Sequence, residues 1–159
     1  MSERRDEPER MRALRKACAA LKVFPLHGVA VIPGTPTPLH VFEPRYKALV
    51  RDALQGDRIL AVPQLHSAEG LREMHPPVRP IAGAGFIEHH FEHPDGKYDI
   101  VIRGLARVRL GDELRSEAAY RTFRAEVAEE RWPRGGPGVL QDQMESLRQL
   151  VLELSTRLP

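Results

Sequence analysis

The sequence predicts an α+β fold that is mainly β, built as a small, curled antiparallel sheet or barrel of about six short strands. Two observations lead to this prediction. First, several short segments alternate apolar and polar side chains, as half-buried strands do, and turns rich in glycine and proline separate them. Second, one helical pattern follows the second strand region, and two more lie at the ends of the chain. We therefore expect helices that flank the sheet.

The first helical pattern lies in residues 7–21. Its apolar side chains recur at spacings of three and four residues and form one stripe, which comprises Met11, Leu14, Cys18 and Leu21. Most other positions of this segment are charged. We therefore expect residues 1–21 to form an N-terminal helical extension, a surface helix with one packed face.

Residues 24–46 are predicted to form a stiff, extended segment with sharp corners. Prolines fix φ and remove backbone donors, and the segment contains Pro25, Pro33, Pro36, Pro38 and Pro44. Short strands are predicted at residues 23–26, 29–32 and 39–42. Pro44 then begins a helix in the favoured first-turn position. The core-facing residues of that helix follow the i, i+3, i+4, i+7 spacing and are Tyr46, Leu49, Val50, Ala53 and Leu54.

The centre of the chain contains the clearest β region. A short apolar strand is predicted at residues 59–62. Residues 83–110 are predicted to form a hairpin around the turn signal Pro-Asp-Gly at residues 94–96. Gly104 interrupts the second strand of this hairpin and predicts a bulge or a tight bend, as at a barrel corner. One more strand is predicted at residues 122–128.

The sequence Pro-Arg-Gly-Gly-Pro-Gly at residues 133–138 predicts a linker, which separates a β domain at residues 22–132 from a C-terminal helix at residues 139–159. The apolar residues of that helix alternate spacings of four and three, as in a heptad pattern, and are Leu140, Met144, Leu147, Val151, Leu154 and Leu158. We expect another helix to cover this stripe. The candidates are the N-terminal stripe and a helix of a second subunit, which would make the protein a homo-oligomer.

The composition excludes several classes of protein. Among 159 residues, 24 Lys and Arg face 22 Asp and Glu, and the net charge of +2 provides no strong attraction for nucleic acid. No apolar run approaches the ~20 residues that span a bilayer. The N-terminus mixes acidic and basic residues without an apolar core, so it is not a secretory signal. With a single cysteine, no internal disulfide forms, and we expect a soluble cytoplasmic protein that binds no membrane.

The segment FPLHGVAVIPGTPTPLHVFEPRYKALVRDAL closely resembles the start of the N-terminal, substrate-binding domain of Lon-type ATP-dependent proteases. The shared elements are FPL, a proline-glycine turn, a PL pair and FEPRY before an amphipathic helix. A second block supports the resemblance: a strand led by Gly85, a hairpin at Asp95-Gly96, and a strand with the GxxR sequence of Gly104 and Arg107. The similarity covers roughly residues 22–132.

The resemblance implies a pseudo-barrel like that of PUA domains, followed by a helical segment of which residues 139–158 look like the start. It also implies a domain that binds protein substrates. The sequence contains no G-x-x-x-x-G-K-[ST] motif for nucleotide phosphates and leaves no room for an ATPase or a peptidase module. We therefore expect a stand-alone form of the domain, without enzyme activity and without a cofactor.

The residues themselves do not predict a catalytic or metal site. His89 and His90 point to opposite faces of a strand, and His89 lies roughly 13 Å from His93 at ~3.3 Å per residue, whereas zinc requires ligands at ~2 Å. We therefore expect no metal site. Ser67 and Ser116 lie in polar connections without a nucleophile motif, and Cys18 lies on the packed stripe of a helix.

The alternative function is RNA binding by a PUA-like domain. Arg103, Arg107 and Arg109 could form a basic strand face. Cross-strand ion pairs with residues such as Glu126 explain the same arginines, and no aromatic platform lies between them. Nucleic acid is therefore the less favoured ligand.

The preferred function is a non-catalytic protein-binding module, related to proteolysis and protein quality control, that recognises unfolded polypeptide or a partner protein. The predicted contact surface consists of Leu26, Pro36, His40 and Phe42. Glu43 and Arg45 bracket the start of the helix at Pro44. Because a carboxylate is favoured at a helix N-terminus and an arginine can fold back onto it, we interpret this pair as a structural lock of the corner.

Overall fold

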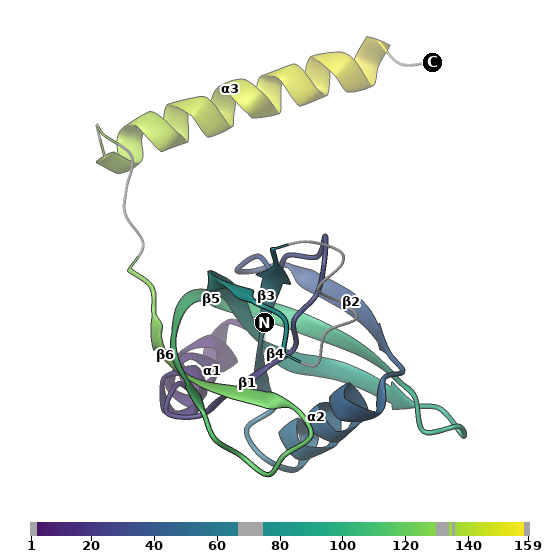
Figure 1. Cartoon of the computed structure of the whole chain (residues 1–159). Helices are drawn as coiled ribbons and strands as arrows, with labels where there is room; N and C mark the ends of the chain where they lie inside the picture. The colour runs from purple at the N-terminus through teal and green to yellow at the C-terminus, as the bar shows by residue number, and fades with distance from the viewer. Residues whose placement is uncertain (1–2, 67–74, 130–133, 135, 158–159) are drawn as a thin grey trace. The chain divides into compact units, whose positions relative to one another are not determined.

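The computed structural model describes residues 3–66, 75–129, 134 and 136–157. The chain divides into two compact units, Met1–Ala128 and Glu129–Pro159. The first unit contains a β-barrel and two helices, α1 (Glu3–Ala17) and α2 (Pro44–Gln55), and the second contains helix α3 (Gly136–Arg157) (Figure 1). The fold is therefore a mixture of helices and a dominant sheet, which confirms the predicted α+β class.

The described part of the chain forms one sheet of six strands: β1 (Leu21–Val23), β2 (Pro36–Val41), β3 (Ile59–Leu65), β4 (Val78–Glu92), β5 (Tyr98–Leu114) and β6 (Arg121–Val127). Their order is β2-β5-β4-β3-β1-β6, and an additional pairing of β5 with β6 closes the last five strands into a barrel. Among the strands of the described residues, β2 pairs only with β5 and is the edge strand. The predicted number of strands is confirmed, but β4 and β5 have 15 and 17 residues and are longer than expected.

Strand β5 reaches three neighbours because it bends. Its first half pairs with β2, its second half pairs with β6, and β4 runs along both. The ladder between β4 and β5 shifts register where Gly85 lies opposite Gly104 and Ala84 lies opposite Ala106. This irregularity confirms the bulge or bend predicted at Gly104. Bulges increase the local bend, so one long strand turns the barrel corner without a loop.

The strand predicted at residues 29–32 is wrong. Residues 24–35 contain no regular strand, and Val31 and Ile32 cross β4 and β5 at Gly83 and Gly104. A Cβ atom at Gly104 would overlap the carbonyl oxygen of Ile32, and one at Gly83 would overlap that of Val31. The apolar run at residues 29–32 suggested a strand, but the crossing chain approaches the barrel through these two glycines.

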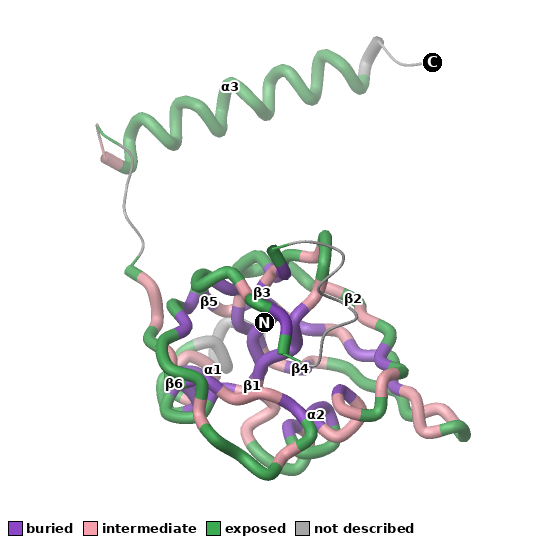
Figure 2. Tube along the Cα trace, in the orientation of Figure 1, coloured by how far each residue is buried: buried purple, intermediate pink, exposed green. Residues whose placement is uncertain are grey.

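Helix α1 packs tightly on the barrel. Leu14, Cys18 and Leu21 are buried, together with residues of β3, β4 and β5 (Figure 2). The packed face predicted for this segment is therefore confirmed. The helix ends at Ala17 and not at residue 21 as predicted. Leu21 already belongs to β1, where it pairs with Phe123 of β6.

Helix α2 covers the second half of the core. Its buried residues are Tyr46, Leu49, Val50 and Ala53, as the spacing predicted. They pack in a cluster with Phe24, Val41 and Ile100. Pro44 occupies the start of the helix, so the predicted strand-to-helix corner is confirmed.

Helix α3 exposes its apolar side chains. The exposed set includes Val139, Leu140, Met144, Leu147, Leu150, Val151, Leu152 and Leu154. Leu158 of the predicted stripe lies outside the described residues, as do parts of the predicted linker at residues 133–138, within which α3 begins at Gly136. No helix in the described part of the chain is long and apolar enough to cross a membrane.

Candidate functional site

The ends of β2, β5 and β4 bring five side chains to one outward face of the sheet. In the ladders, His40 of β2 lies opposite Asp99 of β5, and Phe91 of β4 lies opposite the same Asp99. Directly opposed residues share a face. Because alternate residues of a strand also share a face, Phe42 and His93 continue this row at its end. We call His40, Phe42, Phe91, His93 and Asp99 the aromatic–histidine surface.

A tight turn holds His93 in place. The backbone N–H of His93 donates to the carbonyl of Lys97 at 2.8 Å, and that of Gly96 donates to the carbonyl of His93 at 2.8 Å. Gly96 has φ of 75°, and the carboxylate of Asp95 accepts a hydrogen bond from the N–H of Lys97. The turn signal at residues 94–96 is thereby confirmed. It sets His93 beside the carboxylate of Asp99.

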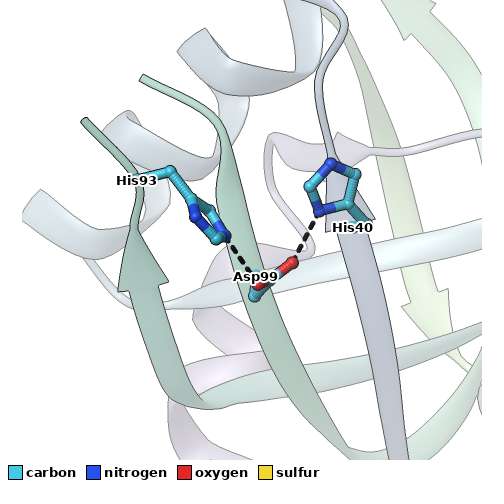
Figure 3. Close-up of side chains that lie close together, drawn as sticks. All are labelled: His40, His93 and Asp99. Atoms are coloured by element: carbon cyan, nitrogen blue, oxygen red, sulfur yellow. Dashed lines mark hydrogen bonds and ion pairs between the residues drawn. The ribbon is translucent and has the colours of Figure 1, made fainter. Parts of the chain in front are cut away.

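Asp99 joins the two imidazoles (Figure 3). His40 Nδ1 lies 2.6 Å from Asp99 Oδ1, and His93 Nε2 lies 2.6 Å from Asp99 Oδ2. An ionised carboxylate only accepts hydrogen bonds, so each ring nitrogen donates. The hydrogen bonds from His40 and then from His93 lower the pKa of Asp99, and the carboxylate is held in its charged form. The ligand atoms of the three residues lie within 4.8 Å of one another, so together they could hold a metal ion.

Two phenylalanines flank these polar groups. Phe42 and Phe91 are each 60% exposed. The ring of Phe42 stacks on that of His40 with centroids 6.1 Å apart, and Phe91 meets His93 edge-on at 4.9 Å. Exposed rings of this size on one face are a feature of contact surfaces rather than of cores.

The structure divides the contact residues expected from the sequence. His40 and Phe42 belong to the aromatic–histidine surface, and Pro36 is exposed further along β2. Leu26 lies elsewhere. It is partly buried against the core and forms an isolated parallel β-bridge with Gln64 of β3. The members that the sequence reasoning missed are Phe91, His93 and Asp99. The separation of 59 residues between His40 and Asp99 hid their proximity, because only the strand register aligns them.

The free edge of β2 is poorly suited to pairing with an added strand. Pro36 and Pro38 have no N–H, and within a sheet proline is confined to positions whose N–H would face away from the neighbouring strand. Both prolines therefore remove outward donors of this edge, a known way of preventing edge-to-edge association. Binding on this part of the molecule must then use side chains of the face.

Glu43 and Arg45 contact each other at the start of α2. Arg45 Nε donates to Glu43 Oε2 at 3.0 Å, and the guanidinium lies over the ring of Tyr46, 4.5 Å from its centroid. Glu43 occupies the N-cap position without a side-chain cap. These contacts join the residue before the helix to its first turn, the arrangement that a corner lock requires.

A separate cavity of ≈ 450 Å³ lies near Arg45, between the connection from β5 to β6 and the start of α2. Two of its charged groups, Arg121 and Glu113, are paired with each other. Arg121 donates to both oxygens of Glu113 at 2.7 and 2.8 Å and to the carbonyl of Pro76 at 2.6 Å. These internal contacts hold the walls of the cavity together and engage the guanidinium of Arg121 and the carboxylate of Glu113.

The arginines that suggested RNA binding also have partners. Arg103 pairs with Glu88 at 3.0 Å, and Arg109 pairs with Glu126 across the β5–β6 ladder at 3.6 Å. Cross-strand ion pairs of this kind were the alternative explanation for these residues. They leave less positive charge available for a phosphate backbone.

The family model for the ATP-dependent protease La (LON) substrate-binding domain matches residues 20–159. The chain belongs to the Lon substrate-binding domain family. Among curated relatives, this Lon domain is 31% identical to the Lon protease of Salinispora arenicola over 137 residues and 28% identical to Lon protease 2 of Myxococcus xanthus over 144 residues. The matches cover 85% and 87% of this chain but only 16% and 17% of those proteins.

Solved structures show the same Lon domain fold. The N-terminal domain of the Mycobacterium avium complex Lon protease superimposes with a TM-score of 0.63 at 15% identity, covering 87% of this chain and 69% of that one. The Lon N-terminal domain protein from Xanthomonas campestris superimposes with a TM-score of 0.58 at 24% identity, covering 82% and 74%. At these identities the comparison establishes the fold.

Proposed function

We propose that this Lon domain is a non-catalytic protein-binding module that recognises unfolded polypeptide, or a partner protein with exposed apolar side chains, through its aromatic–histidine surface. The observation that carries the proposal is the pair of phenylalanines, Phe42 and Phe91, each 60% exposed on one face of the sheet. Family membership supports a role in substrate recognition. The proposal includes a cytoplasmic role in protein quality control, associated with proteolysis.

The chemistry of the surface suits such a ligand. Unfolded chains expose aromatic and aliphatic side chains that a folded protein buries, and their transfer onto apolar surface is favourable. Aromatic residues bury large areas at low entropic cost and dominate many interfaces. Between Phe42 and Phe91, the imidazoles and the carboxylate of Asp99 offer polar contacts to a peptide backbone. Because β2 lacks donors at its prolines, we expect binding to depend on these side chains.

The test is a titration of the full chain with a fluorescently labelled, permanently unfolded protein, followed by anisotropy. We expect saturable binding with a dissociation constant below about 100 μM. The double variant Phe42→Ala/Phe91→Ala should weaken binding at least about tenfold, because truncation of anchoring aromatic side chains commonly costs more than ~1 kcal/mol each.

The matched control is Ile81→Ala. Ile81 is also an exposed apolar residue of β4, but it lies ten residues from Phe91, roughly 33 Å along an extended strand. Its substitution should leave the affinity unchanged. Absence of saturable binding by the wild-type chain, or equal affinities for the wild type and the double variant, would refute this surface as the binding site.

RNA binding remains the alternative function, and no observation favours it. Arg103 and Arg109 contact carboxylates, and the net charge of the chain is only +2. A gel-shift titration with structured RNA at low salt tests it directly, since electrostatic binding is strongest there. We expect no shift.

A further inference from the structure

We propose that His40, His93 and Asp99 form a binding site for a first-row divalent transition-metal ion of the zinc class. The sequence pattern did not predict this site, because the adjacent histidines His89 and His90 lie on opposite faces of β4. The fold instead combines His93 with two residues from other strands. This site goes beyond protein binding and does not depend on it.

The donor set suits such an ion. Two imidazole nitrogens and one carboxylate oxygen are ligands that zinc and its neighbours accept, whereas magnesium and calcium prefer oxygen ligands alone. The three ligand atoms lie within 4.8 Å of one another. Tetrahedral bonds of ~2.0–2.1 Å require a separation of about 3.3 Å, so the side chains must adjust their positions when an ion binds. Three protein ligands leave one position for water or for a ligand from solution.

The backbone holds the three residues close together before any ion binds. His40 and Asp99 are directly paired in the β2–β5 ladder, and His93 closes the turn between β4 and β5. Packing of Phe42 on His40 and of Phe91 on His93 restricts the two rings. Ligands on rigid strands lose little conformational freedom when they bind.

The two hydrogen bonds to Asp99 indicate what a bound ion would replace. Each ring nitrogen that an ion requires now donates a hydrogen bond to the carboxylate at 2.6 Å. An ion between the three groups displaces these protons: each imidazole then binds through a lone pair, with its proton on the other ring nitrogen. The side chains of His40 and Asp99 are 53% exposed and that of His93 is 33% exposed, so small rotations can open the space.

The proposed site lies within the aromatic–histidine surface, so a bound ion would change the charge of that surface. A bound ion would be held by His40 and His93, against which the rings of Phe42 and Phe91 pack. It would thus add a fixed positive charge to the middle of an aromatic face.

The first experiment is isothermal titration of the full chain with zinc ions. We expect one ion per chain with a dissociation constant at or below about 10 μM. His40→Ala, His93→Ala and Asp99→Ala should each weaken binding at least about tenfold, because each removes one of three ligands. The control His89→Ala removes an exposed histidine of β4 outside the site and should leave the binding unchanged.

The second experiment uses the wild-type chain alone, so it does not depend on whether a variant folds. The ring nitrogens of ¹⁵N-labelled histidines are followed by NMR during the zinc titration. We expect Nδ1 of His40 and Nε2 of His93 to change shift as metal ligands, while His89 stays unchanged. The proposal is overturned if zinc up to about 100 μM shows no saturable binding, if the three variants bind as the wild type does, or if other histidines shift instead.

Discussion

At the scale of single residues, Gly104 shows how one missing side chain shapes the barrel. The crossing chain at Ile32 lies on this glycine, and a Cβ atom there would overlap backbone that cannot move aside easily. The same position lies at the register shift between β4 and β5. A glycine is therefore required here for the close approach of two backbone segments, although glycine weakens the interior of a strand.

We expect Gly104→Ala to lower the free energy of unfolding by more than about 3 kcal/mol, because overlap with backbone is among the few mechanisms of large destabilisation. Chemical denaturation measures this loss. The control is Gly111→Ala in the same strand, where a Cβ atom would lie 3.3 Å from the carbonyl oxygen of Arg124 and need only a small adjustment. Equal effects of the two substitutions would contradict the close approach at Gly104.

Glu88 joins α1 to the sheet and makes stability depend on pH. Its carboxylate lies 3.2 Å from Arg10 of α1 and 3.0 Å from Arg103 of β5, and its side chain is only 12% exposed. Burial by itself raises the pKa of Glu88, but the hydrogen bonds from Arg103 and Arg10 outweigh it, and the net pKa is lowered. The folded state thus favours the charged carboxylate.

We expect Glu88→Gln to lower the free energy of unfolding by about 2 kcal/mol near neutral pH, as hydrogen bonds to charged groups do. Because the folded pKa lies below the unfolded value of about 4.3, this stabilisation is complete above that value and is lost as the pH falls through the folded pKa. Denaturation curves at several pH values should show the gap between wild type and variant closing in acid. The control is Glu92→Gln, at an exposed residue. If the difference in the free energy of unfolding between the wild type and Glu88→Gln did not change with pH, the role of the charge on Glu88 would be contradicted.

At the scale of elements, the corner between β2 and α2 combines a proline with an ion pair. Pro44 begins the helix, and Glu43 and Arg45 contact each other on either side of it. We propose that this pair locks the corner and does not take part in binding. Its side chains are 35% and 23% exposed, so solvent weakens the pair.

A double-mutant cycle with Glu43→Gln and Arg45→Met tests the lock. We expect a coupling of about 0.5–1 kcal/mol in the free energy of unfolding, the upper range for partly exposed ion pairs. Neither substitution should change the affinity for an unfolded protein. Loss of that affinity without loss of stability would instead assign Glu43 and Arg45 to the binding surface.

At the scale of the whole molecule, the unit Met1–Ala128 contains both hydrophobic clusters, whereas α3 exposes an apolar stripe. The sequence suggested two helices that could cover this stripe. The apolar face of α1 is already buried against the barrel, with Leu14 fully buried. We therefore propose that α3 associates with α3 of a second subunit.

We expect the full chain to show concentration-dependent association in analytical ultracentrifugation. Leu147→Glu/Val151→Glu should abolish it, because charges replace the centre of the apolar stripe. The control Arg148→Glu changes an exposed position of the same helix outside the stripe. A chain truncated after Ala128 should remain monomeric and keep the stability of the barrel. A full chain that stays monomeric at about 100 μM would contradict self-association.

Most of the fold was predictable because its signals are local. The start of α2 at Pro44, its buried face, the turn at residues 94–96 and the bend at Gly104 depend on side-chain periodicity and on the backbone preferences of proline and glycine. These properties act between residues a few positions apart. The same local signals failed at residues 29–32, where an apolar run resembled a strand but the chain forms none.

The sequence by itself determined the family, the α+β class and the order of the elements apart from the strand expected at residues 29–32. Only the tertiary structure decided the aromatic–histidine surface. His40 and Asp99 are 59 residues apart, and the ladders that align them with Phe91 include a register shift between Ile87 and His89. A shift of one residue would turn the side chains of a strand to the opposite face. The surface therefore depends on the register of three strands, which no local pattern of residues specifies.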